Sequence, residues 1–187
     1  MPRRACPAPR RPTAVLLGAL ALAAAACGSS SATTANSGAT TTAPAVAAPA
    51  ANQFTSGAVP AADGATDMKA APTLHAGTGT APTTLVGKDL VVGTGPVASA
   101  TSTVNIQYVG ALYTTGQVFD SSWTRGQPAS FSLSQVIPGF AQGIVGMKVG
   151  GRRELVIPPA LGYGNSAQGS IPANSTLVFV IDLLGVS

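Results

Sequence analysis

Pro138 opens a short helical pattern over residues 138–145, in a chain whose other folded segments have strand patterns. Proline suits the first turn of a helix, because the amide hydrogen that it lacks would have no partner inside the helix. Val136 and Ile137 stand just before this helix, where side chains can point into a concave surface, and Phe140 lies two residues into it. We expect Phe140 to form an aromatic floor between apolar walls. The segment therefore predicts a small cup that binds an apolar group.

Strand patterns lie on both sides of this helix. In residues 104–108, the apolar side chains of Val104, Ile106 and Tyr108 alternate with polar ones, as in a strand that buries one face. The pattern over residues 176–184 is the most apolar, and we expect that strand to lie centrally in its sheet. Several strands joined by short turns, with one short helix, predict an α+β fold in which an antiparallel sheet wraps around the helix. The other predicted strands cover residues 85–92, 118–120, 129–133 and 152–157.

Charged residues are few and unevenly placed. They make up 9% of the chain, against about 25% in a usual globular protein. Four of the ten basic residues lie within the first dozen positions, and the six that remain balance the six acidic residues. Without the first residues the chain is near neutral, so its basic balance is no argument for binding nucleic acid. We expect Arg152 and Arg153 at a strand surface or as partners of Glu154.

Residues 1–27 have the pattern of an export signal. Two pairs of arginines precede the apolar run Ala14 to Ala26, which is shorter than the roughly 20 residues that span a bilayer. A basic start, a short apolar run and small residues at its end are typical of a secretory signal. Cys27 follows Ala24-Ala25-Ala26 and resembles the lipidated cysteine of a bacterial lipobox, although leucine is usual at the position of Ala24. We predict lipidation of Cys27.

The alternative is ordinary cleavage of the signal, with Cys27 incidental. A lipidated protein is expected on the outer face of the cell membrane, and one that is not lipidated is expected to be secreted or periplasmic. The only other cysteine, Cys6, lies inside the leader. No disulfide framework is therefore expected in the mature domain.

Residues 28–81 consist largely of Ala, Thr, Ser, Gly and Pro. Such a segment has too little apolar bulk to offset the entropy of ordering, so we predict a disordered tether that is partly flexible and partly stiffened by proline. His75 is the only histidine and has no cluster of metal-ligating residues around it, so it predicts no metal site. The folded domain is expected to cover residues 82–187 and to be a monomer.

Seven short motifs occur in order and at close spacing between residues 118 and 179. They are Val118-Phe119-Asp120-Ser121-Ser122, Val136-Ile137-Pro138-Gly139, Gly146-Met147-Lys148-Val149-Gly150, Ile157-Pro158-Pro159, Leu161-Gly162-Tyr163-Gly164, Ile171-Pro172 and Ala173-Asn174-Ser175-Thr176-Leu177-Val178-Phe179. With these motifs, residues 82–186 closely resemble FKBP-type peptidyl-prolyl cis–trans isomerases. The resemblance implies a curved antiparallel sheet around one short helix, which agrees with the α+β fold expected above. It also implies isomerase activity on X–Pro peptide bonds.

By position, the resemblance places a proline-binding pocket in this chain. The implied catalytic residues are Tyr108, Phe119, Asp120, Tyr163 and Phe179, and the implied substrate-binding residues are Val136, Ile137, Phe140 and Ile171. Three positions depart from the usual pattern, and all three reduce the aromatic lining. Phe140 replaces a tryptophan, Ala129 stands where many members have phenylalanine, and Leu161 stands where an aromatic residue is common.

Asp120 directly follows Phe119, and neighbouring side chains of a regular strand point to opposite faces. For both to share the pocket, the backbone must be irregular at this point, which Ser121-Ser122 permits. The resemblance makes Asp120 a polar group of the pocket that orients a tyrosine or the substrate. Alternatively, Asp120 is only a turn or capping residue. In the same way, the apolar residues Phe119, Val136, Ile137 and Phe179 could belong to an ordinary hydrophobic core without forming a pocket.

Isomerisation of an X–Pro bond sets few chemical demands. Rotation faces a barrier of about 18–20 kcal/mol that comes from amide resonance. No covalent bond is made or broken, so no nucleophile, metal or cofactor is expected, and catalysis means binding the twisted amide better than the planar forms. The twisted amide has less charge separation, so a dry apolar pocket favours it over water.

The expected partners follow from the resemblance. They are proline-containing polypeptides and macrolides such as tacrolimus or rapamycin, together with a membrane reached through the lipid anchor. The Tyr163 hydroxyl and the Ile171 amide are the implied hydrogen-bond donors to substrate or macrolide. No nucleic acid is expected.

Two functions of other classes are open alternatives to the isomerase. One is a module that binds proline-containing segments without useful turnover, suggested by the three departures in the pocket. The other is a lipid-anchored surface protein in which the fold is only a scaffold. Measuring the exchange of a short X–Pro peptide separates the isomerase from both.

Overall fold

The computed structural model describes residues 54–187. The predicted export signal over residues 1–27, the predicted lipidation site Cys27 and the first part of the predicted tether lie outside the described residues. In the part that the structure describes, no helix is both long and apolar enough to cross a bilayer. The same residues contain no group of three or more His, Cys, Asp or Glu side chains that could hold a metal ion.

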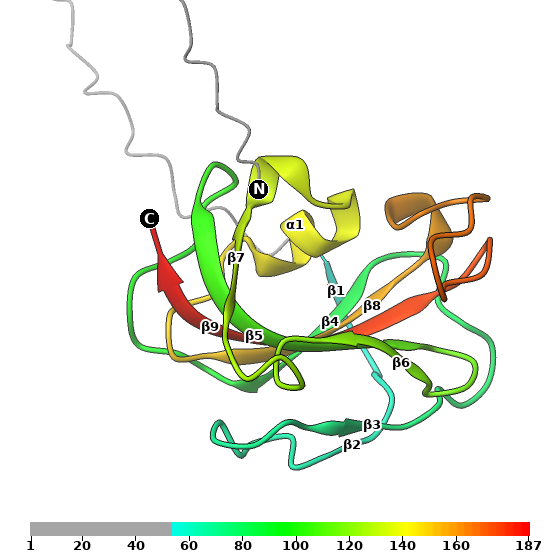
Figure 1. The fold of residues 1–187 in the computed structure, drawn as a ribbon, viewed down its shortest axis with the longest axis horizontal. Coiled ribbons are helices and arrows are strands. Elements are labelled where there is room, and N and C mark those ends of the chain that lie inside the picture. Colours follow the sequence, from blue (N-terminus) through cyan, green and yellow to red (C-terminus); the bar gives the residue numbers. More distant parts are fainter. Residues whose placement is uncertain (1–53) are drawn as a thin grey trace, which may run out of the picture. The chain divides into compact units, whose positions relative to one another are not determined.

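A seven-stranded sheet has the strand order β1-β4-β8-β9-β5-β6, with β7 also paired to β5 (Figure 1). All neighbouring strands are antiparallel except β1 and β4, which are parallel. β9 lies between β8 and β5, which confirms the prediction of a central last strand. The strands are β1 (Thr55–Ser56), β4 (Val86–Val91), β5 (Thr103–Leu112), β6 (Val118–Ser121), β7 (Ala129–Ser132), β8 (Arg152–Ile157) and β9 (Leu177–Val186).

The sheet curves around helix α1 (Pro138–Ile144), as Figure 1 shows. Pro138 stands in the first turn, which confirms the helix start expected from the sequence. The short 3-10 helix Leu133–Gln135 precedes α1, and a second one, Pro159–Leu161, follows β8. A Cβ atom on Gly143 would lie 2.2 Å from a methyl carbon of Leu155, so only glycine lets α1 lie this close to β8.

The inner core, between α1 and the sheet, is apolar. It contains side chains from β5, β8, β9 and the helix. Among its fully buried members are Val104, Ile106, Ile144, Leu155, Ile157, Leu177, Ile181 and Leu183.

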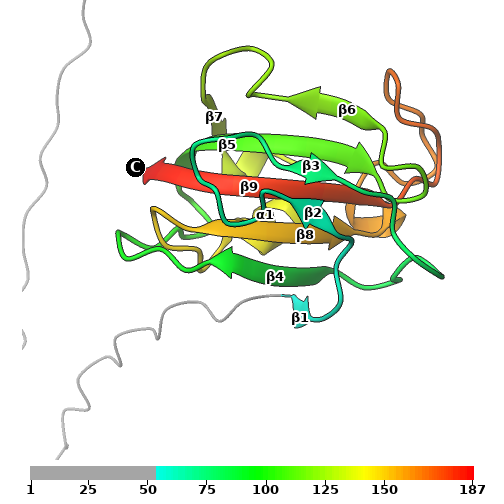
Figure 2. The ribbon, with the colours of Figure 1, turned by 90° about the horizontal axis from the view of Figure 1, so that it is seen from below.

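Residues 59–81 cover the outer face of the sheet, whereas β1 pairs with β4 at the edge of the sheet and Phe54 packs against the inner core. Within them, β2 (Ala62–Asp63) and β3 (Thr73–Leu74) form a two-stranded antiparallel sheet, which Figure 2 shows in front of the main one. Leu74 belongs to an outer cluster of buried apolar residues that includes Val109, Val156 and Val180, and Val59, Ala62 and Ala81 pack against it. The predicted tether over residues 28–81 therefore extends too far, because the folded part begins by residue 54. The few apolar residues of this segment are held in place by packing against the sheet. Composition alone therefore did not predict that the segment is ordered.

Buried arginines correct a second expectation. Arg152 and Arg153 are not surface charges, since both are buried. Arg152 forms an ion pair with Asp182, with Nη2 2.6 Å from Oδ2, and donates to the carbonyl oxygens of Gly64 and Ala70 in the outer segment. Arg153 pairs with Asp89 and donates to the Gly143 carbonyl of α1 at 2.7 Å.

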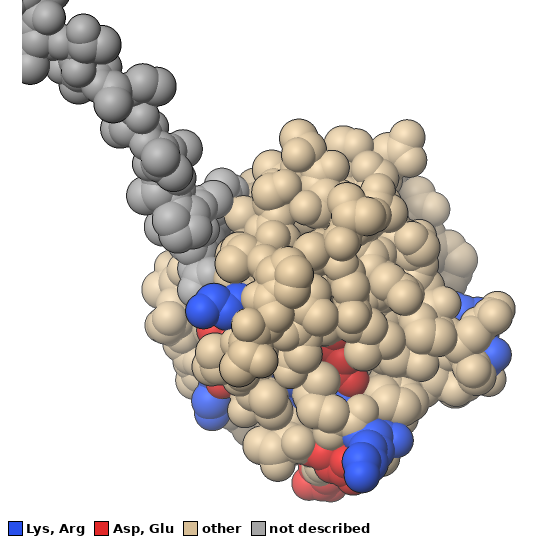
Figure 3. Space-filling model, turned by 90° about the vertical axis from the view of Figure 1, so that its left-hand side faces the viewer, with Lys and Arg blue, Asp and Glu red and all other residues tan. Residues whose placement is uncertain are grey.

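Glu154 directly follows Arg153 in sequence, but the ion pairs of the two arginines join them to Asp182 and Asp89. Surface charge is correspondingly scarce. On the face shown in Figure 3, charged side chains lie toward the outer segment, and none appears on the upper part, toward α1.

Candidate active site

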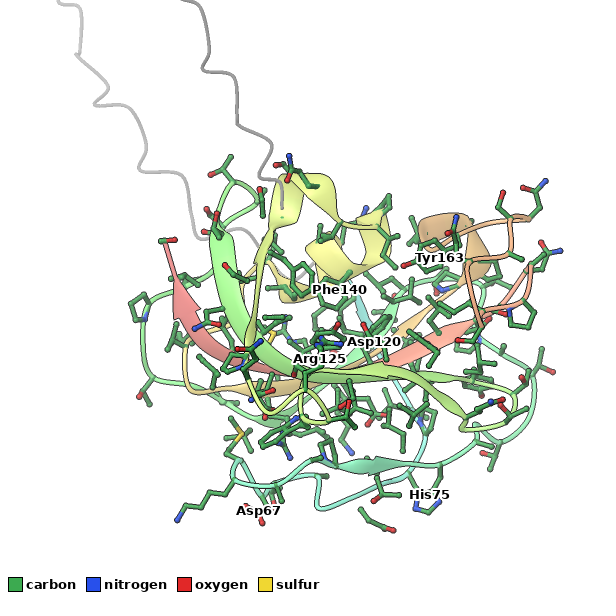
Figure 4. All side chains as sticks on the ribbon, viewed as in Figure 1. Asp67, His75, Asp120, Arg125, Phe140 and Tyr163 are labelled. Atoms are coloured by element: carbon green, nitrogen blue, oxygen red, sulfur yellow. The ribbon has the colours of Figure 1, made fainter. Side chains whose placement is uncertain are left out.

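A cavity of about 340 Å³ lies between α1 and the inner face of the sheet. Figure 4 shows Asp120, Phe140 and Tyr163 on the α1 side of the sheet, whereas Asp67 and His75 lie on the opposite side. Every site residue expected from the sequence lines this cavity, except Ile171. The lining residues are Tyr108, Phe119, Asp120, Phe131, Gln135, Val136, Ile137, Phe140, Tyr163 and Phe179.

Five of the six aromatic rings that line the cavity contact one another and form most of its apolar surface. The ring of Phe140 on α1 lies 5.1 Å from that of Phe179 on β9, and Phe179 lies 5.6 Å from Phe119 on β6, in edge-to-face contacts. Tyr108 on β5 and Phe131 on β7 complete the set, with ring centroids 5.9 Å apart. Such contacts hold the rings in defined orientations. The cavity thus has rigid apolar walls contributed by four strands and the helix.

A bulge in β6 brings Asp120 into the cavity beside Phe119. Gly110 of β5 is paired with Asp120, and the next residue, Ala111, is paired with Val118, so Phe119 and Asp120 together oppose one residue of β5. A β-bulge of this kind breaks the alternation of side chains. The backbone irregularity that was expected near Asp120 is therefore present. It lies at Phe119 and Asp120, just before Ser121-Ser122, which were expected to permit it.

Gly110 is the partner that makes room at this bulge. A Cβ atom at this position would lie 2.8 Å from ring atoms of both Phe119 and Phe179. Because Gly110 has no side chain, the rings of Phe119 and Phe179 can meet over β5 at this position.

The polar side of the cavity is a cluster of three side chains, in which Tyr108 and Asp120 line the cavity and Arg125 contacts both of them. The Tyr108 hydroxyl donates a hydrogen bond to the Asp120 carboxylate. Arg125, from the turn after β6, forms an ion pair with Asp120, and its Nη2 donates to the Tyr108 hydroxyl at 2.8 Å. Asp120 thus accepts from two donors, and one of them is a cation.

These contacts set the protonation states. Burial acts to raise the pKa of Asp120, but the hydrogen bonds from Tyr108 and Arg125 and the charge of Arg125 outweigh it, so the pKa lies below its usual value. The pKa of Tyr108 is raised by burial and by its hydrogen bond to Asp120. At neutral pH the cluster therefore holds an ionised carboxylate and a neutral tyrosine. Asp120 is suited to accept hydrogen bonds and not to act as a general acid.

Tyr163 and Ile171, the two implied hydrogen-bond donors, have different surroundings. Tyr163 lines the cavity and is 37% exposed, so it stays accessible. Ile171 is buried, and its amide already donates to the carbonyl of Gln168 at 2.8 Å. The expected role of the Ile171 amide as a donor to ligand is thus not available in this conformation, because a turn of its own segment occupies it.

Three residues of the site were not expected from the sequence. Phe131 lines the cavity two positions after Ala129, on the same face of β7, so strand alternation would have indicated it. This ring adds aromatic surface that the expectation from Ala129 left out. Gln135 also lines the cavity, and Arg125 reaches it from a turn. No local pattern distinguishes either of these two from an ordinary polar loop residue.

Comparisons with known proteins agree on one family. The family model described as FKBP-type peptidyl-prolyl cis–trans isomerase matches residues 95–184. The chain is 51% identical over 112 residues to an FK506-binding protein of Streptomyces anulatus, covering 58% of this chain and 90% of that protein. It is 46% identical over 110 residues to the FKBP-type peptidyl-prolyl cis–trans isomerase FkpA of Escherichia coli K12, covering 59% of this chain and 40% of that one.

Solved structures agree with the sequence relatives. The crystal structure of FkpA from Escherichia coli matches with a TM-score of 0.54 and 45% identity, over 58% of this chain and 51% of that chain. The crystal structure of AtFKBP13 matches with a TM-score of 0.52 and 39% identity, over 58% of this chain and 97% of that chain.

Proposed function

We propose, because this chain belongs to the FKBP-type peptidyl-prolyl cis–trans isomerases, that its aromatic cavity is where it isomerises X–Pro bonds. The activity itself follows from the family, and proline-containing polypeptides are its substrates. The observation that supports this location is one cavity that combines five mutually contacting aromatic rings with an ionised, doubly hydrogen-bonded Asp120.

The aromatic walls would act on the amide by excluding water. A planar X–Pro amide carries charge separation from its resonance, and water stabilises that charge. Twisting the bond reduces the charge separation. Transfer from water to an apolar cavity therefore costs less free energy for the twisted form than for the planar form. Phe140 and Phe179 form the apolar surface against which the proline ring would lie, with Val136 and Ile137 beside it. Binding the twisted form better than either planar form lowers the barrier.

The polar cluster would orient the substrate and not exchange protons with it. Asp120 stays ionised, and Arg125 and Tyr108 hold its two oxygens in place. A fixed carboxylate at the edge of an apolar wall fits the amide dipole in one orientation, and the accessible Tyr163 hydroxyl can donate to a substrate carbonyl. Positioning of this kind acts without a charged intermediate.

Asp120→Leu tests the location of the site. The side chain is not part of the inner core, so the fold should stay nearly intact, whereas the loss of hydrogen bonds to a charged group should lower kcat/KM roughly tenfold. Exchange spectroscopy on a short X–Pro peptide measures the rate, and circular dichroism checks the fold. Asp67→Leu is the matched control, because Asp67 is exposed on the other side of the sheet. Wild-type exchange by a folded Asp120→Leu variant would refute this location.

The FK506-binding name of the Streptomyces relative supports a further proposal about ligands. We propose that macrolides of the tacrolimus or rapamycin kind occupy the same aromatic cavity. A macrolide bound there should inhibit peptide exchange competitively, and it should bind less tightly to Asp120→Leu than to Asp67→Leu.

We propose that the protein acts outside the cytoplasm and is held at the membrane by lipidated Cys27. The support is the sequence alone, since the basic start, the short apolar run and the small residues before Cys27 are those of a lipoprotein signal. Replacing the cysteine by serine removes the thiol that lipidation requires. Cys27→Ser should therefore move the protein from the membrane fraction to the soluble envelope fraction or the medium. If fractionation and immunoblotting find it unchanged at the membrane, the anchor lies elsewhere.

A further inference from the structure

The turn between β6 and β7 extends to both faces of the sheet. Trp123 packs against the outer cluster that contains Leu74 and Val109, on the face covered by residues 59–81. Only two residues later, Arg125 reaches the cavity on the inner face, where it contacts Asp120 and Tyr108. Figure 1 shows this turn extending below the sheet on the side of β3. One short turn thus joins the outer apolar cluster to the polar cluster of the site.

Backbone hydrogen bonds make this turn a rigid connection. The Ser122 hydroxyl accepts from the Tyr108 amide at 2.8 Å, and the Ser122 amide donates to the Tyr108 carbonyl at 3.0 Å. The Arg125 amide donates to the Ser122 carbonyl, and the Gly126 amide donates to the Trp123 carbonyl. The positions of Trp123 and Arg125 relative to one another are therefore fixed within the turn.

The Arg125 side chain is not held by burial, because 43% of it is exposed. From Ser121 to Pro128, Trp123 is the single large apolar side chain, so it is the residue of this turn that can gain most from packing. Burial of the indole on the outer face would fix the turn in the one position from which Arg125 meets both of its partners.

We propose that Trp123 is a positioning residue of the isomerase site, which acts through Arg125 on Asp120 and Tyr108 from the opposite face of the sheet. This inference rests on the proposed function, since it takes the polar cluster as part of the site. Trp123 does not line the cavity. Its effect on catalysis therefore depends on Arg125 being present.

A double-mutant cycle tests this dependence. We expect Trp123→Ala and Arg125→Ala each to lower kcat/KM for a short X–Pro peptide by roughly three- to tenfold, and the double variant to be no slower than Arg125→Ala alone. Trp123→Phe should recover most of the activity, because a ring again fills the outer cluster. Leu90→Ala is the matched control, since Leu90 packs on the same cluster from β4 and should leave kcat/KM unchanged. If the effects of Trp123→Ala and Arg125→Ala multiply, the proposal is wrong.

A second measurement holds even if Trp123→Ala does not fold. Trp123 is the only tryptophan of the chain, so the intrinsic emission spectrum reports on it directly. Coupling is reciprocal, and Arg125→Ala should therefore loosen the turn and shift the emission of Trp123 to longer wavelength while the protein stays folded. An unchanged spectrum would overturn the proposal.

The outcomes separate this inference from the proposed function. If Arg125→Ala and Asp120→Leu both keep full activity, the polar cluster is not part of the site, and the proposed location of the activity fails. If Arg125→Ala is impaired but Trp123→Ala is fully active, the site stands and only the role of Trp123 fails.

Discussion

Phe179→Ala should lower the free energy of unfolding by about 3–5 kcal/mol, because it removes a buried ring from the inner core. Phe179 is only 6% exposed, although it lines the cavity. Its ring contacts those of Phe119, Phe140 and Tyr108. Removing it enlarges the cavity and lets its neighbours reorient, so kcat/KM for an X–Pro peptide should also fall more than tenfold at a temperature where the variant is folded.

Leu183→Ala separates the two effects. Leu183 is fully buried in the same inner core and on the same strand, but it does not line the cavity. We expect a loss of stability of about 2–5 kcal/mol with near wild-type exchange rates. Urea unfolding gives the stabilities, and peptide exchange gives the activities. If Leu183→Ala loses as much activity as Phe179→Ala, destabilisation and not the shape of the cavity explains the result.

Glu154→Gln should make the protein more stable above neutral pH. Glu154 lies on the outer face of β8, opposite Lys88 on β4, and its Oε1 is buried without a hydrogen-bond partner. Burial raises the pKa of Glu154 to about 7, although the charge of Lys88 acts to lower it. Ionising a carboxyl group in such surroundings is costly. The variant removes this cost because its side chain stays neutral.

The sign of the pH effect follows from proton binding. Between the usual pKa of 4.5 and the folded value of about 7, the native state holds a proton that the unfolded state has lost. The contribution of Glu154 to stability is therefore complete below about pH 4.5 and is lost as the pH rises through about 7. The stability of Glu154→Gln relative to the wild type should increase across this range, by on the order of 3 kcal/mol.

Urea unfolding at a series of pH values measures this difference. Burial also raises the pKa of Asp182. Asp182 is present in both proteins, so its contribution to the pH dependence of stability cancels in the comparison. Glu154→Leu should show the same pH dependence as Glu154→Gln, since neither side chain ionises. Parallel stability curves for the wild type and Glu154→Gln would show that the carboxyl group is ionised in the folded protein throughout.

Local sequence determined the parts of this protein whose partners are close along the chain. Pro138 marked the start of α1, because its missing amide has no cost in a first helical turn. Alternation at Val104, Ile106 and Tyr108 marked β5, and the apolar run of β9 marked the central strand. The ordered motifs from Val118 to Phe179 then identified the family. By position, the resemblance also named the residues that line the cavity, apart from Phe131 and Gln135.

Contacts between distant segments decided the rest. Residues 54–81 look like a tether because their few apolar side chains have no local pattern, and the folded sheet supplies the partners of these side chains. The bulge that turns Asp120 toward Phe119 depends on Gly110, and the pKa of Asp120 depends on Arg125 and Tyr108. The same holds for Trp123, whose packing partners lie on other strands. Sequence records which side chains are present, but burial and charge depend on which of them the folded sheet brings together.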